Sequence, residues 1–121
     1  NETISEVVES CKNKNWLGLV IACVSPEIIE NSIEEVKNLN IPFGYKANLW
    51  KAEEPIPVHK FASPNDKIGA NPNETMGTRD DYTGLKFLEF SKKMLSKGAT
   101  ILGGCCEIKP QHIEKISILK K

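Results

Sequence analysis

Short apolar runs alternate along the chain with stretches that have one apolar helical face, and this alternation constrains the fold most strongly. The apolar runs at 16–22, 41–47 and 99–102 predict strands, and the first is expected to be buried on both faces. Apolar residues at helical spacing predict four helices, beginning near Ile4, Pro26, Asp80 or Asp81, and Pro110. This order of elements is typical of βα units around a parallel sheet.

Residues that favour helix ends support these boundaries. Ser25 followed by Pro26 predicts a helix start, because serine accepts a hydrogen bond from a free backbone N–H and proline lacks that group. Gly98 is expected to end the third helix. The inward residues of that helix are predicted to be Leu85, Leu88 and Leu95. The proline-rich segment 51–78 has little periodicity and is predicted to be a long ordered loop.

Three parallel strands of this kind cannot form a stable sheet alone, because their faces and edges need cover. A closed (β/α)₈ barrel of the TIM type needs about 250 residues, so the chain corresponds to about half a barrel, or about three and a half βα units. An open three-layer sheet fits the same pattern. The chain begins with Asn1 rather than Met, and we expect upstream sequence to complete the domain.

The charge balance excludes several classes of partner. Lys plus Arg number 16 and Asp plus Glu number 16, so no basic field points to nucleic acid or anionic lipid. No apolar run approaches the length of a membrane span, and no signal-peptide pattern opens the chain. We therefore expect a cytoplasmic protein whose cysteines are reduced thiols.

Three of the four cysteines follow predicted strands. Cys23 comes directly after the first strand, and Cys105 and Cys106 come just after the third. Because the carboxyl ends of parallel strands meet at one edge of a sheet, these thiols are expected to converge there. Three thiolates suit a catalytic zinc site, which keeps a fourth position open. Gly103 and Gly104 are expected to let the backbone turn sharply before the cysteine pair.

The residues alone leave other interpretations open. A single cysteine at a strand end is usually a core residue, and an adjacent pair can pack or form a redox-active disulfide. Asn48 ends the second strand, where its amide could reach a metal or substrate or simply form a turn. Neither histidine, His59 nor His112, has a partner at ligand spacing, and both are predicted to lie on the surface.

Three segments resemble one family. GGCCEIKPQHIEKI, at 103–116, resembles the Gly-Gly-Cys-Cys motif of the zinc-dependent homocysteine S-methyltransferase family, which closes the last strand of a barrel. IACVSPEII, at 21–29, resembles the upstream ligand motif, which normally reads Gly-hydrophobic-Asn-Cys followed by Ser-Pro-Glu. YKAN, at 45–48, resembles a segment that ends on an asparagine near the metal. The resemblance covers nearly the whole chain except 51–78.

This chain departs from the family pattern at four positions. Ala22 replaces the usual asparagine before the first ligand cysteine. Lys46 and Ala47 replace a more usual proline before the asparagine. Glu107 stands where a small or basic residue is frequent. The three cysteines are retained, so these departures concern the substrate rather than the metal.

The resemblance implies that residues 1–121 are the C-terminal portion of a single homocysteine-binding (β/α)₈ barrel domain. Cys23, Cys105 and Cys106 would bind Zn²⁺, and homocysteine would enter as the fourth ligand through its sulfur. The thiolate would then take a methyl group from an activated donor, giving methionine. Asn48, Gly103 and Gly104 would contact the substrate. The 121-residue portion alone is expected to be inactive, because the donor site of the family lies largely upstream.

Two rivals remain at this point. One is a non-catalytic zinc-binding barrel paralogue, and the other is a dithiol redox protein that uses Cys105 and Cys106. The expected partners are small molecules, homocysteine or a close thiol such as selenohomocysteine, and a methyl donor. The sequence does not identify that donor among S-methylmethionine, S-adenosylmethionine, betaine and methylfolate or cobalamin, nor does it indicate an oligomeric state.

Overall fold

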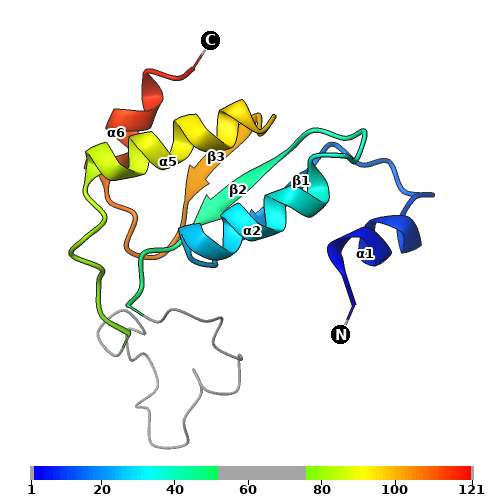
Figure 1. Cartoon of the computed structure of the whole chain (residues 1–121), viewed down its shortest axis with the longest axis horizontal. Helices are drawn as coiled ribbons and strands as arrows, with labels where there is room; N and C mark the ends of the chain where they lie inside the picture. The colour runs from blue at the N-terminus through cyan, green and yellow to red at the C-terminus, as the bar shows by residue number, and fades with distance from the viewer. Residues whose placement is uncertain (1, 52–75, 121) are drawn as a thin grey trace, which may run out of the picture.

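The computed structural model describes residues 2–51 and 76–120 of the chain. Within these ranges helices and strands alternate as predicted, and the fold belongs to the α/β class (Figure 1). In chain order the elements are α1 (Ile4–Ser10), β1 (Leu19–Ala22), α2 (Pro26–Val36), β2 (Phe43–Ala47), α5 (Gly84–Ser96), β3 (Ile101–Gly104) and α6 (Pro110–Ser117). None of the helices in the described ranges is long and apolar enough to cross a membrane.

The three strands form a parallel sheet in the order β1-β2-β3, so their carboxyl ends lie along one edge. In the register of this sheet, Lys46 of the central strand lies between Ala22 of β1 and Gly103 of β3. The ends of the three strands are therefore level with one another, and the residues that follow them start from neighbouring positions.

The core lies on one face of the sheet, where α2 and α5 lie along the strands (Figure 1). Tyr45 points into this core and its hydroxyl lies 2.6 Å from the hydroxyl of Ser91, so a buried polar group of each element is satisfied by the other. The fully buried residues around them are Ile29, Ile33, Val36, Ala47, Leu49, Phe87 and Met94.

The opposite face of the sheet is exposed. Val20 and Ile101 are 42% and 37% exposed, and Lys46, further along the central strand, is exposed as well. The prediction that the first strand is buried on both faces is therefore wrong for the described residues. Its side chains alternate between half-buried and exposed because α2 and α5 cover only one side of the sheet.

All three strands differ from their predicted limits, and β2 begins at Phe43 rather than at position 41. β1 begins at Leu19 rather than at position 16, because the indole N–H of Trp16 donates to the Cys11 carbonyl (2.6 Å) just after α1. β3 extends to Gly104, so both glycines belong to the strand. The predicted sharp turn at these glycines is wrong, since neither has a positive φ. The residues that turn the backbone are Cys23 (φ 59°) and Glu107 (φ 61°).

The third predicted helix, α5, begins later than expected. Thr83 caps it by accepting from the Lys86 N–H (3.2 Å), so neither Asp80 nor Asp81 starts the helix. Leu85 was predicted to face inward but is 63% exposed, because aromatic residues form the face of α5 that packs on the core. Leu88 is buried as predicted, and the inner face otherwise consists of Phe87, Phe90, Ser91 and Met94.

The other helix boundaries agree with the predictions. Ser25 caps α2 by accepting from the Ile28 N–H (3.4 Å), and Pro26 occupies the first turn. Gly98, with a φ of 98°, follows the end of α5. Of the predicted loop 51–78, residues 52–75 lie outside the described residues. At its ends, Trp50 and Thr78 form an antiparallel bridge.

Candidate metal centre

The sulfurs of Cys23, Cys105 and Cys106 converge at the carboxyl edge of the sheet. The Sγ atom of Cys105 lies 3.1 Å from that of Cys23 and 3.7 Å from that of Cys106. The Cys23 and Cys106 sulfurs are 3.9 Å apart. All three cysteines are free and half-buried, and their sulfurs form the one group in the described ranges that could hold a metal ion. The predicted convergence of the three thiols is present in the structure.

Backbone hydrogen bonds continue the parallel pairing beyond the strands and bring the sulfurs together. The Cys23 N–H donates to the Lys46 carbonyl (2.7 Å), and the Cys105 N–H donates to the Ala47 carbonyl (2.7 Å). The Cys106 carbonyl accepts from the Leu49 N–H (3.0 Å). The last residues of β2 and Leu49 after it thus hold the cysteine loops of both neighbouring strands.

The sulfur geometry can be compared with that of a metal site. A tetrahedral ion with metal–sulfur bonds of about 2.3 Å holds its sulfurs about 3.8 Å apart. Two of the three separations, 3.7 and 3.9 Å, agree with this value, and the 3.1 Å pair would have to open slightly. A disulfide needs about 2.05 Å. Three soft donors in this arrangement therefore fit a thiophilic divalent ion such as zinc.

The electrostatics of the cluster also favour a cation. Burial, followed by the neighbouring thiols, raises the pKa of Cys106 to about 12. Burial likewise raises the pKa of Cys23, followed by its hydrogen bond with Cys105. Burial also acts to raise the pKa of Cys105, but hydrogen bonds with Cys23 and Cys106 outweigh it and lower that pKa. One thiol therefore ionises first, and three thiolates need a cation between them.

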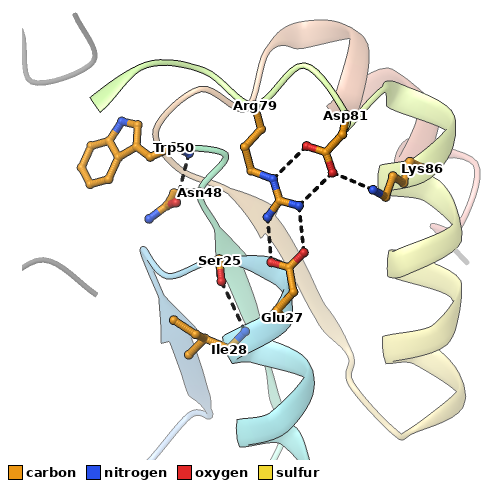
Figure 2. Close-up of polar contacts among 8 residues, drawn as sticks. All are labelled: Ser25, Glu27, Ile28, Asn48, Trp50, Arg79, Asp81 and Lys86. Atoms are coloured by element: carbon orange, nitrogen blue, oxygen red, sulfur yellow. Dashed lines mark hydrogen bonds and ion pairs between the residues drawn. The ribbon is translucent and has the colours of Figure 1, made fainter. Parts of the chain in front are cut away.

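Asn48 lies beside the cluster and is only 5% exposed. Its side-chain N–H donates to the Cys23 carbonyl (2.7 Å) and lies 4.0 Å from the Cys23 sulfur. Its side-chain oxygen accepts from the Trp50 N–H at 3.3 Å, as Figure 2 shows. Asn48 is thus more than a turn residue, because it holds the carbonyl of a cysteine whose backbone is in the left-handed region.

The two glycines before the cysteine pair differ in their surroundings. A Cβ atom at Gly104 would lie 2.2 Å from Cγ2 of Ile108, so glycine is needed there for the loop to fold back. A Cβ atom at Gly103 would meet only the Tyr45 carbonyl, at 3.6 Å. Gly104 therefore allows close packing under the cysteine pair, and Gly103 lies on the exposed face beside Lys46.

Sequence reasoning missed a charged network close to the site. Arg79 donates two hydrogen bonds to Glu27, at 2.7 and 2.8 Å, and two to Asp81, at 2.9 and 3.0 Å (Figure 2). Asp81 also accepts from Lys86 (2.7 Å). Arg79 is the single arginine of a chain rich in lysine, and this was the available signal.

The segment that carries Arg79 contacts the loops after all three strands. Glu27 belongs to the first turn of α2, just beyond Cys23. The Arg79 N–H donates to the Leu49 carbonyl (2.9 Å) after β2, and the Thr78 hydroxyl donates to the Glu107 carboxylate after β3. Residues 78–81 therefore tie the surroundings of the metal centre together.

His112 was predicted to lie on the surface, and that prediction is wrong because the residue is 5% exposed. Its Nδ1 accepts from the Lys109 N–H (2.9 Å), so Nε2 carries the proton and donates to the Tyr82 carbonyl (3.0 Å). The ring thus joins the start of α6 to the segment before α5. His59 lies outside the described residues.

Comparisons with known proteins address the family. Searches of curated proteins and of solved structures each found no match to the chain. The sequence model of the family described as homocysteine S-methyltransferase matches residues 1–119, nearly the full length. This match includes Cys23, the Cys105–Cys106 pair and the parallel strands that place them. The chain therefore belongs to the homocysteine S-methyltransferase family.

Proposed function

We propose that the chain is the C-terminal portion of a single (β/α)₈ barrel domain of a zinc-dependent methyltransferase, which transfers a methyl group from an activated donor to homocysteine and forms methionine. One observation carries this proposal: in a chain of this family, three cysteine sulfurs meet at the carboxyl edge of a parallel sheet. That edge is where ligands bind in barrels.

The arrangement of the sheet supports a barrel. Helices cover the face that holds Tyr45, while Val20, Lys46 and Ile101 are exposed on the other face. In a (β/α)₈ barrel the helices lie outside and the opposite face of each strand lines the interior. The exposed face would then be the interior wall, closed by strands that lie upstream in the sequence.

Each residue of the site has a role in this proposal. Cys23, Cys105 and Cys106 would hold the zinc as thiolates and leave one position for the sulfur of homocysteine. A zinc ion held there would supply a lowered pKa for the substrate thiol, so that a thiolate would be available at neutral pH. Asn48 fixes the Cys23 carbonyl, and Gly104 lets the following loop pack closely, so both keep the donor atoms in place.

The proposed methyl transfer needs no oxidant or reductant. The homocysteine sulfur attacks the methyl carbon, an S–C bond forms, and the bond between that carbon and the donor breaks. The electron pair of the broken bond leaves with the donor, and the proton of the thiol is released to solvent. A positively charged donor leaves as a neutral molecule, which favours transfer. This is why we propose an activated donor such as a sulfonium or quaternary ammonium compound.

The proposal is tested with the full-length protein by metal analysis and a methyl-transfer assay. Cys23→Ser and Cys106→Ser are expected to lose most of the bound zinc and at least a hundredfold in activity, because loss of a ligand should cost more than the about 10- to 100-fold caused by removing a hydrogen-bond partner of a ligand. Cys11→Ser is the matched control, since Cys11 lies outside the cluster. Homocysteine is assayed against a panel of donors.

The outcomes separate the proposal from its rivals. A protein with one tightly bound zinc and no methyl transfer with any donor supports the non-catalytic paralogue. A zinc-free protein with a reducible disulfide between Cys105 and Cys106 contradicts the proposal and supports the dithiol protein. Zinc in the wild type, its loss in both serine variants and its retention in Cys11→Ser support a thiolate metal centre.

A further inference from the structure

Lys46 is a charged residue on the exposed face of the sheet, close to the metal centre. It lies in the central strand β2 between Tyr45 and Ala47, both of which are fully buried on the core side. Its own side chain therefore projects from the opposite face and is exposed. Its neighbours in register are Ala22 and Gly103, two of the smallest residues, so there is room beside its side chain.

The backbone of Lys46 lies next to that of the cysteines. Its carbonyl accepts the N–H of Cys23 (2.7 Å), and the residue after it accepts the N–H of Cys105. Burial acts to raise the pKa of Cys105, while the hydrogen bonds with Cys23 and Cys106 and, after them, the charge of Lys46 act to lower it. The ammonium group therefore lies close enough to act on the cluster.

Six lysines of the described ranges form ion pairs with carboxylates, and Lys46 is not among them. The paired lysines are Lys12, Lys37, Lys51, Lys86, Lys93 and Lys97. A lysine beside a thiolate cluster, with small neighbours and without a carboxylate partner in the described part of the chain, has its charge available for a ligand.

We propose that Lys46 binds the α-carboxylate of the amino-acid thiol and so determines specificity for homocysteine over thiols that lack a carboxylate. This inference rests on the proposed function. A substrate held through its sulfur has its α-carbon three bonds away, and its carboxylate then lies near three cysteine thiolates. Such a negative surrounding disfavours the carboxylate unless a cation is close, and Lys46 supplies that cation.

The test compares two thiols that differ by one group. Calorimetric titration of the zinc-loaded full-length protein with L-homocysteine and with 3-aminopropane-1-thiol isolates the contribution of the carboxylate. In Lys46→Met we expect binding of homocysteine to weaken about ten- to a hundredfold, the range for a charge-assisted hydrogen bond. Binding of 3-aminopropane-1-thiol should be unchanged. Lys46→Arg, which keeps the charge, should retain most of the preference for homocysteine.

Lys51→Met is the matched control, because Lys51 follows the same strand but its ammonium is paired with Asp80. It should bind both thiols as the wild type does, and zinc content is measured for every variant. Equal weakening of both thiols in Lys46→Met, or no weakening of either, would overturn the role of Lys46. If the wild type binds neither thiol, the proposed function fails and this inference fails with it.

Discussion

Gly104 is required because of its surroundings, not because of its backbone conformation. A methyl group there would overlap Ile108, which packs beneath the cysteine pair. We expect Gly104→Ala to cost about 1–3 kcal/mol, the usual range for overpacking, and to lower the affinity for zinc. Thermal unfolding and zinc content of the full-length protein measure both effects.

Gly103 provides the control for this prediction. A Cβ atom at Gly103 has its nearest neighbour at 3.6 Å, an ordinary contact. Gly103→Ala should therefore unfold close to the wild-type temperature and keep its metal. If both alanine variants behaved alike, packing against Ile108 would not be the reason for glycine at position 104.

Asn48 allows a second prediction at the residue scale. Asn48→Ala removes the donor to the partly buried Cys23 carbonyl, and the loss of this hydrogen bond should cost about 0.5–1.5 kcal/mol. Asn48→Asp should weaken zinc retention further, because a carboxylate would face both that carbonyl and the nearby thiolate. Zinc release to a chelator gives the order wild type, alanine and aspartate from slowest to fastest. Slower release from the aspartate variant would show direct ligation instead.

At the residue scale, the convergence of the cysteines at the strand ends could be predicted, and the packing of other side chains could not. Cys23, Cys105 and Cys106 follow apolar runs, and parallel strands bring such positions together. His112 gave no signal, because its two partners are backbone groups of Lys109 and Tyr82. Backbone partners leave no trace in a residue pattern, and the histidine was therefore assigned to the surface.

At the scale of elements, Arg79 connects the first turn of α2 to the segment before α5. The hydrogen bonds that Glu27 accepts from Arg79 lower the pKa of Glu27. The hydrogen bonds that Asp81 accepts from Arg79 and Lys86 lower the pKa of Asp81. A carboxylate whose folded pKa is below its unfolded value stabilises the fold above the unfolded pKa. That contribution is lost as the pH falls through the folded pKa.

The expected result for a variant of Arg79 follows from the lowered pKa of these two carboxyl groups. Arg79→Met should destabilise the full-length protein by about 1 kcal/mol near pH 7, since the partners are largely exposed. The difference from the wild type should stay constant above about pH 5 and shrink below about pH 4, where unfolded carboxylates become protonated. Unfolding midpoints across this range measure it. Lys12→Met, which removes an exposed pair in α1, is the control.

A difference that grew on acidification would contradict this account of the Arg79 network. So would an equal effect of Lys12→Met.

The network also shows why the limits of the elements were harder to predict than their order. Asp80 and Asp81 resemble helix caps in the sequence, but Asp81 is drawn to Arg79 and Lys86, and Thr83 caps α5 instead. Competition between partners of similar chemistry is decided by the tertiary structure.

At the scale of the whole molecule, order and direction of the strands could be predicted because each apolar run is followed by a helix. The burial of each strand's side chains could not be predicted, because it depends on what covers each face of the sheet. Val20 and Ile101 read as core residues in a continuous apolar run, yet they are exposed in the described structure. The run itself is as expected for a strand that faces a barrel interior.

The proposed barrel makes a last prediction about residues 1–121 alone. This portion would expose the face with Val20, Lys46 and Ile101 and both edges of the sheet, β1 and β3. We expect the isolated portion to associate or to unfold over a broad range, and the full-length protein to unfold in one cooperative transition. Sedimentation and denaturant unfolding of both proteins measure this. A monomeric, cooperatively unfolding portion would show that its sheet is complete, and the barrel proposal would fall.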